Sequence, residues 1–134
     1  MAKEAVCIET PTLFSRYTCA DGTGIAKGSV LQLTTPNTAS QSDSDNDVMA
    51  GVAWMEKVAS DGSTQITAAR DGTWMFEAGT AAAITVGNDV VVNGIANNEV
   101  KAYTTLDDEK GYVLGKALET IGTAGVQIMV RLDI

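Results

Sequence analysis

Three aspartates at alternate positions form the clearest cluster of metal-binding side chains in this sequence. Asp43, Asp45 and Asp47 have the spacing of the first three ligands of a calcium-binding loop. The next position, where such a loop needs glycine, is Val48, and Trp54 stands where the loop needs a bidentate glutamate. The residues therefore predict a solvated acidic loop tip, and cation binding is the weaker alternative.

Catalytic chemistry has little support in the residue types present. The glycine-rich segment 21–28 lacks the Gly-Lys-Ser/Thr ending of a phosphate-binding loop, and Asp107, Asp108 and Glu109 are contiguous rather than placed across a cleft. The chain has no histidine, which removes the commonest general base and metal ligand, and its two cysteines are too few for a four-thiolate zinc site. We predict no catalytic residue, cofactor or metal site, and do not expect an enzyme.

Aromatic residues are the remaining candidates for a binding surface. Trp54, Trp74 and Phe76 could form a platform that stacks on a ligand, although such residues more often belong to a core or anchor an interface. Together with Phe14 and Tyr17 they are the candidate interface residues of this chain.

The two cysteines, Cys7 and Cys19, bear on the compartment. Residues 1–4 contain no apolar signal region, so we expect no secretory signal and two reduced thiols. A disulfide between neighbouring strands remains open as the alternative. No apolar run approaches the roughly 18 residues of a membrane-spanning helix, and no membrane partner is expected.

Charge argues against a nucleic-acid partner. The chain has 134 residues, which fits one domain, and its formal net charge is −8. Its nine basic residues are scattered from Lys3 to Arg131, whereas phosphate binding requires clustered Lys and Arg. A protein surface is the more suitable partner.

The elements that must position these side chains are short strands. Strand patterns separated by glycine, proline and polar turns recur about every 8–12 residues, which is typical of an all-β barrel or sandwich. Residues 38–47 have no large apolar side chain and predict an exposed mobile loop. The segments 79–87 and 106–111 allow at most one or two short helices.

Two parts of the chain, about 28–71 and 87–133, resemble each other and predict two pseudo-repeated β units. Chance reuse of glycine and valine is the alternative. The matching positions are 59, 64 and 62 residues apart, in that order: Gly28 with Gly87, Gly51 with Gly115, and Gln65 with Gln127.

The domain organisation follows from that repeat. Residues 21–134 are predicted to form a single β domain. Residues 1–20 lie outside both repeated parts and are predicted to form an N-terminal arm or edge strands, free to add a strand to a neighbouring molecule.

The order of these segments resembles the capsid decoration (head-stabilising, or cement) proteins of tailed phages. The resemblance spans most of residues 24–132, and its motifs are loose and rich in glycine and valine. The segments that carry it are Gly28-Ser-Val-Leu, Met49-Ala-Gly-Val-Ala, Ile66-Thr-Ala-Ala-Arg-Asp-Gly-Thr-Trp, Ile84-Thr-Val-Gly-Asn-Asp-Val-Val-Val, Gly111-Tyr-Val-Leu-Gly-Lys-Ala-Leu-Glu and Gly125-Val-Gln-Ile-Met-Val-Arg-Leu.

The resemblance implies a β-barrel-like virion protein, made in the host cytoplasm, that binds the outside of an icosahedral head. It implies a homotrimer that bridges neighbouring major capsid proteins and resists the pressure of the DNA inside. The family offers no catalytic residue to carry over. Two other classes stay open: a structural subunit of a phage tail or fibre, and a carbohydrate-binding β module, which would need Trp54 and Trp74 exposed together.

Overall fold

The computed structural model describes residues 4–43, 47–79, 83–93, 98–103, 113–123 and 125–134, and its regular elements are all strands. No helix occurs in that part of the chain. Of the two segments for which short helices were allowed, 106–111 lies outside the described residues, and the described residues of 79–87 form no helix. The all-β prediction is confirmed. The strands are β1 (Val6–Glu9), β2 (Phe14–Thr18), β3 (Val30–Thr35), β4 (Thr38–Gln41), β5 (Met49–Ala53), β6 (Gln65–Ala69), β7 (Thr73–Ala78), β8 (Asp89–Asn93), β9 (Glu99–Ala102), β10 (Val113–Ala117) and β11 (Gln127–Leu132).

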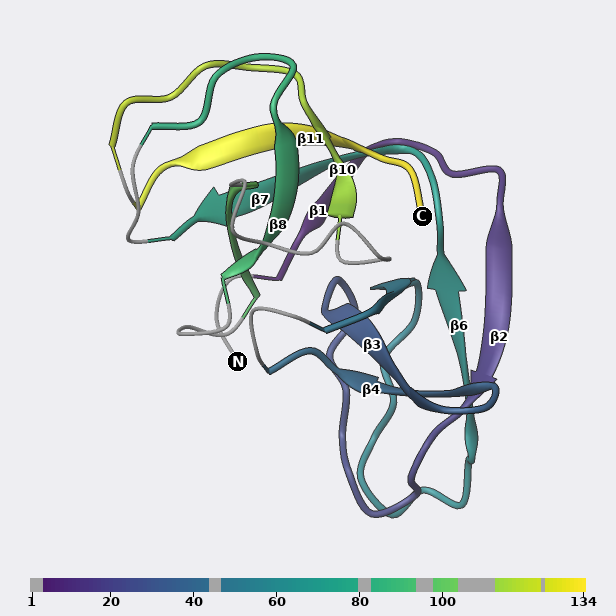
Figure 1. The fold of residues 1–134 in the computed structure, drawn as a ribbon. Helices are drawn as coiled ribbons and strands as arrows, with labels where there is room; N and C mark the ends of the chain where they lie inside the picture. Colours follow the sequence, from purple (N-terminus) through teal and green to yellow (C-terminus); the bar gives the residue numbers. More distant parts are fainter. Residues whose placement is uncertain (1–3, 44–46, 80–82, 94–97, 104–112, 124) are drawn as a thin grey trace.

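The strands form two barrels that lie side by side (Figure 1). The first is a closed barrel in the order β2-β4-β3-β5-β6. The second has the order β7-β11-β10-β8-β9, and a parallel pairing of β9 with the end of β7 closes it. β1 pairs antiparallel with the other end of β7 and so extends the sheet of the second barrel.

The two barrels repeat the same pairings strand by strand. β2 through β6 correspond in order to β7 through β11, and each barrel has one parallel pair, β2 with β4 and β7 with β9. Even the isolated bridges correspond, because Ile25 pairs with Lys57 and Ile84 pairs with Ile121. The prediction of two pseudo-repeated β units is therefore confirmed.

Backbone hydrogen bonds support the offsets that the sequence predicted. Gly28 N–H donates to Ala53 O at 2.9 Å, and Gly87 N–H donates to Ala117 O at 2.8 Å. The two glycines have nearly the same φ, 87° and 88°. These pairs reproduce the offsets of 59 between the glycines and of 64 between the acceptors.

The first unit begins earlier than the sequence indicated. The strand β2 closes the first barrel through β6 on one edge and β4 at Thr18 on the other, so the unit starts at β2 rather than near residue 28. Of the segment 1–20, β1 lies on the edge of β7, and residues 1–3 lie outside the described part.

The prediction of a loop over residues 38–47 is wrong for its first part. Residues 38–41 form β4, which pairs antiparallel with β3. The reason is the narrow interior of this barrel, where a small side chain fills the space: Ala39 is only 1% exposed. A strand without a large apolar residue is sufficient here.

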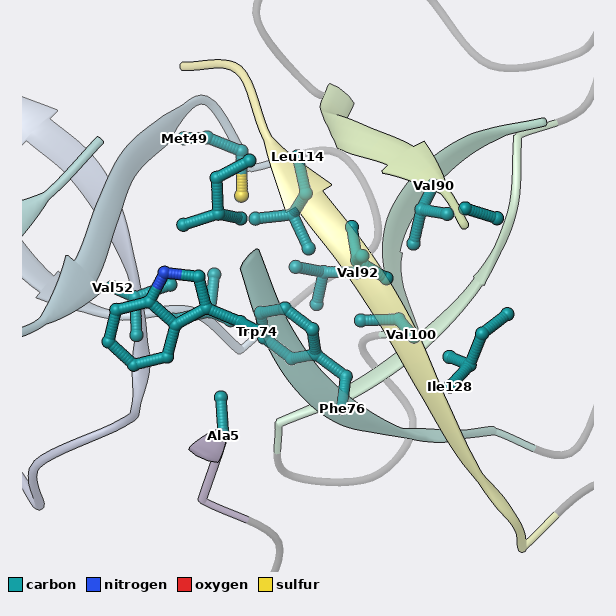
Figure 2. Packing of buried hydrophobic residues seen from close by; sticks show 14 of the residues in the cluster. Ala5, Met49, Val52, Trp74, Phe76, Val90, Val92, Val100, Leu114 and Ile128 are labelled. Atoms are coloured by element: carbon teal, nitrogen blue, oxygen red, sulfur yellow. The ribbon is translucent and has the colours of Figure 1, made fainter. Parts of the chain in front are cut away.

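Two apolar clusters fill the molecule. The smaller one lies within the first barrel and is rich in alanine, including Ala50, Ala53 and Ala68 beside Leu31 and Ile66. The larger one fills the second barrel and reaches across the junction to residues of the first. Figure 2 shows Trp74 between Val52 on one side and Phe76 on the other. The barrels thus share a continuous core, and the outer face of one is buried against the other.

Candidate functional site

A row of aromatic rings runs from the surface into the core at the junction of the barrels. Phe14 begins β2, Trp54 follows β5, and Trp74 lies in β7. The Phe14 and Trp54 rings are 5.4 Å apart, and the Trp54 and Trp74 rings are 6.0 Å apart, both in edge-to-face geometry. Phe14 is 44% exposed and Trp74 1%. Only the outer end of the row can meet a partner.

The register of three strands places Phe14 beside the junction. Phe14 in β2 and Val52 in β5 both lie opposite Ala69 of β6, one on each side of it. Directly opposite residues of adjacent strands point to the same face of a sheet. Because Val52 belongs to the shared core, Phe14 stands at the rim of the same face.

A lysine stands over this row. The Nζ of Lys27 lies 5.2 Å from the centroid of the Trp54 ring, within the range of a cation–π contact. The equivalent positions of the second unit hold no such group: Val86 corresponds to Lys27, Leu118 to Trp54 and Thr73 to Phe14. The cluster of Phe14, Trp54 and Lys27 is therefore a property of the first barrel and is not required by the fold.

Asp71 fixes the chain next to Phe14. Its carboxylate accepts hydrogen bonds from Thr12 N–H at 2.7 Å, Leu13 N–H at 2.9 Å and the Thr12 hydroxyl at 2.6 Å. The Thr12 hydroxyl and then the Leu13 N–H stabilise the charged form and lower the pKa of Asp71. Its carbonyl also accepts a 3.1 Å bond from Trp74 Nε1. One residue thus holds both the entry to β2 and the buried indole.

We predict that the contribution of Asp71 to stability disappears in acid. A carboxyl whose pKa is lower in the folded state stabilises the fold above its unfolded pKa of about 3.9, and that stabilisation is lost as the pH falls through the folded value. Asp71→Ala should cost about 1 kcal/mol at pH 7, as for other carboxylates that accept backbone N–H bonds, and less below pH 4. Urea denaturation at several pH values measures the difference.

The control for this change is Asp133→Ala. Asp133 is the exposed aspartate at the equivalent position of the second unit. We expect a small effect at every pH. A cost for Asp71→Ala that stays constant from pH 7 to pH 3 would contradict the assigned role of its carboxylate.

Lys57 is the one buried lysine of the described residues, and its amino group is fully engaged. Its Nζ contacts the Asp61 carboxylate at 2.9 Å, the Asp21 carboxylate at 3.2 Å, and the carbonyls of Val58 and Asp21 at 2.6 and 2.9 Å. Burial alone lowers the pKa of Lys57, but the bonds to Asp61 and Asp21 outweigh it and raise the pKa. A charged amine held by four oxygens joins the loops at the tip of the barrel and is not a nucleophile.

The structure separates the five candidate interface residues. Phe14 is exposed and Trp54 is half-buried, so these two side chains reach the surface. Tyr17 is half-buried, packs against the core of the first barrel and donates a 3.2 Å hydrogen bond to Ala50 O. Trp74 and Phe76 are fully buried and belong to the core rather than to a surface.

Sequence reasoning missed most of the exposed apolar side chains. Most of them belong to short strands or their ends, where a strand pattern cannot tell which face meets solvent, whereas Val58 and Val86 lie in the connections between strands. They are Val6, Ile8, Leu13, Leu33, Val48, Met55, Val58, Val86 and Val126, in addition to Phe14.

The condition for a carbohydrate-stacking platform is not met. Trp74 is buried, and the planes of Trp54 and Trp74 are inclined at 82°. Two indoles that stack on one sugar chain must both be accessible to it. Here Trp74 lies in the core and Trp54 packs against it, so the pair does not form such a surface.

The structure gives the surroundings of two features that the sequence singled out, the acidic loop and the two cysteines. Asp47 is buried, and its Oδ2 accepts 2.9 Å bonds from the Ser42 hydroxyl and the Asp43 N–H; Asp45 lies outside the described residues. Among the described residues, no group of three or more His, Cys, Asp and Glu side chains could hold a metal ion. Cys7 and Cys19 are both free thiols, and burial raises the pKa of each.

Comparisons with known proteins show a relationship at the level of the fold. No family model matches the chain, and no curated protein matches it. The structure is similar to the crystal structure of the N base of head fiber gp8.5 in bacteriophage phi29, with a TM-score of 0.54 and 17% sequence identity. The match covers 90% of this chain and 95% of that chain. No helix in the described residues is long and apolar enough to cross a membrane.

Proposed function

We propose that the protein is a non-enzymatic structural component of a phage virion. It binds the outer surface of an icosahedral head and stabilises the shell by bridging neighbouring major capsid proteins. The observation that carries this proposal is the shared fold with the base of a phage head fibre over nearly the whole length of both chains. The motif resemblance to decoration proteins points to the same location.

The remaining features of the chain suit this role. A net charge of −8 is compatible with the exterior of a head, where no contact with DNA is needed. The polar clusters around Lys57 and Asp71 hold loops together instead of leaving reactive groups free. We propose a homotrimer without cofactor, nucleic-acid or membrane partner, in which many weak contacts to the shell add up to avidity.

The similar structure favours one second candidate, the base of a fibre attached to the head. Both functions require binding to the shell, but they differ in the consequence. A decoration protein joins neighbouring shell subunits and must raise the resistance of the head to heat, whereas a fibre base needs only attachment.

The test is co-sedimentation of the purified protein with undecorated, expanded heads. We expect saturable binding at a fixed number of copies per head and a higher temperature of DNA release. Binding without an increase in that temperature would favour the fibre base. Failure to sediment with heads would contradict both functions.

A further inference from the structure

The two barrels differ at the edge of one pair of equivalent strands. In the second barrel, β11 covers one edge of β7, while β1 and β9 share the other. In the first barrel, β6 covers one edge of β2, but β4 reaches the other only at Thr18. Within the described residues, no strand covers the edge of β2 from Phe14 to Tyr17, which runs along the outside of the molecule (Figure 1).

Backbone N–H and C=O groups alternate in direction along β2, and their hydrogen bonds show which residues face this edge. Leu13 O accepts from Arg70 N–H, and Cys19 N–H donates to Thr64 O, each at 2.9 Å, so the odd-numbered residues face β6. Thr18 N–H donates in the opposite direction, to Asn37 O at 2.8 Å. Alternation along the strand then directs the N–H and C=O groups of Phe14 and Arg16 to the uncovered edge.

In the second barrel, the equivalent edge of β7 is occupied by a strand. The equivalents of Phe14 and Arg16 are Thr73 and Met75, and these are the register partners of Glu9 and Val6 in β1. β1 is therefore an intramolecular example of a short extended segment bound at this edge. Nothing in the described part of the chain plays this role for the first barrel.

The edge of β2 is also free of the bulge that blunts the other edge strand. β2 pairs with β6 in regular register over its whole length. β1, the other edge strand, has a bulge between Cys7 and Glu9, where the Cys7 thiol donates to Glu9 O at 3.3 Å. Bulges prevent further strand pairing, and a regular edge invites it.

We propose that the Phe14–Tyr17 edge of β2 binds an extended segment of a partner protein by antiparallel strand addition. Side chains directly opposite in such a pair share one face. The segment needs an acidic residue opposite Arg16 and an apolar residue opposite Phe14, since both of these side chains are exposed. Read along the partner, the pattern is acidic, any residue, apolar.

Local charge selects this partner over a second copy of the chain. Arg16 gives this edge a positive charge within an acidic protein, and the only polar partner of the Arg16 guanidinium in the described residues is the neutral Gln65 side chain. The nearby carboxylate of Asp71 is occupied by Thr12 and Leu13. A two-fold contact between two such edges would bring the positive groups of both copies together.

This inference deepens the proposed function by naming a contact surface, and it rests on that function only for the identity of the partner. The edge is tested by itself with the peptide Thr-Thr-Glu-Val-Leu-Thr-Thr added to the full chain, followed through backbone amide resonances. We expect chemical-shift changes centred on Phe14 and Arg16. Arg16→Glu should lower the affinity for this peptide about tenfold. The same substitution should raise the affinity for a second peptide in which Lys replaces the Glu.

The matched control is Arg131→Glu, which changes the net charge equally on β11, a strand covered on both edges. It should leave peptide binding unchanged. A peptide N-methylated at the amides that face β2 should not bind. Absence of shifts at millimolar peptide, equal effects of the two charge reversals, or the same shifts arising from protein concentration alone would each overturn the proposal.

Head binding is a separate measurement and keeps the two proposals distinguishable. The peptide assay decides whether the β2 edge accepts a strand. Co-sedimentation of the unaltered chain with heads decides the proposed function, whatever the peptide assay gives.

Discussion

Replacing Asn98 with alanine is expected to lower the free energy of unfolding by about 4 kcal/mol. Asn98 precedes β9 in the second barrel, but its side chain bonds to the first: Oδ1 accepts from Val30 N–H at 2.6 Å and Nδ2 donates to Gly28 O at 2.9 Å. Alanine would leave the buried Val30 N–H unpaired, at roughly 1–3 kcal/mol. It would also remove one of the two hydrogen bonds to Gly28 O, at about 1 kcal/mol, because that carbonyl still accepts from Ala5 N–H. Chemical denaturation measures the loss.

The backbone of Asn98 adds to this cost and defines the control. Its φ is 64°, in the left-handed region that alanine adopts at about 1 kcal/mol. Asn37, at the equivalent position of the first unit, has a φ of 53° but an exposed side chain. Asn37→Ala therefore carries the conformational strain alone and should cost about 1 kcal/mol. Equal costs at the two positions would contradict a role for Asn98 in joining the barrels.

The role of Asn98 also shows what a single sequence cannot predict. Asparagine next to Asn97 indicates a turn, and a turn does precede β9. Its side-chain partners, however, are 68 and 70 residues away in the chain. Local pattern gives no information about which backbone groups of another barrel bind this amide.

The fold class and the repeat were predictable because they depend on local pattern. Alternating apolar residues between turn residues identify strands, and the recurrence of Gly51 as Gly115 and of Gln65 as Gln127 identifies the units. The start of the first unit was not predictable in this way. The strand β2 has Phe14 where β7 has Thr73, and Arg16 where β7 has Met75, so the two share no visible motif.

The aromatic residues were predicted with mixed success for a related reason. Trp74, Phe76 and Ala78 alternate with Thr73, Met75 and Glu77, so the pattern separates two faces of β7. It does not reveal that the first barrel covers the indole of Trp74, because that contact depends on how the two units pack together. Phe14 belongs to a similar alternation but ends at the rim of the junction.

The second large effect is expected from Gly115→Ala, which should lower the free energy of unfolding by about 3 kcal/mol or more. Gly115 lies opposite Leu132 where β10 crosses β11. A Cβ at position 115 would lie 1.9 Å from Arg131 O and 2.8 Å from the same carbonyl carbon. These are backbone atoms of a core strand, so relief requires moving β11. Thermal and urea denaturation measure the change.

Gly122→Ala is the control, because a Cβ at Gly122 would meet nothing within 4 Å. Its effect should stay within about 0.5 kcal/mol. At the same place in the first barrel, a Cβ on Gly51 would lie 2.6 Å from Ala69 O. Both units therefore need glycine at the equivalent position of β5 and β10, where these strands pair with β6 and β11. Since the core is shared, Gly115→Ala should shift a single unfolding transition; loss of the second barrel alone would show instead that the barrels fold independently.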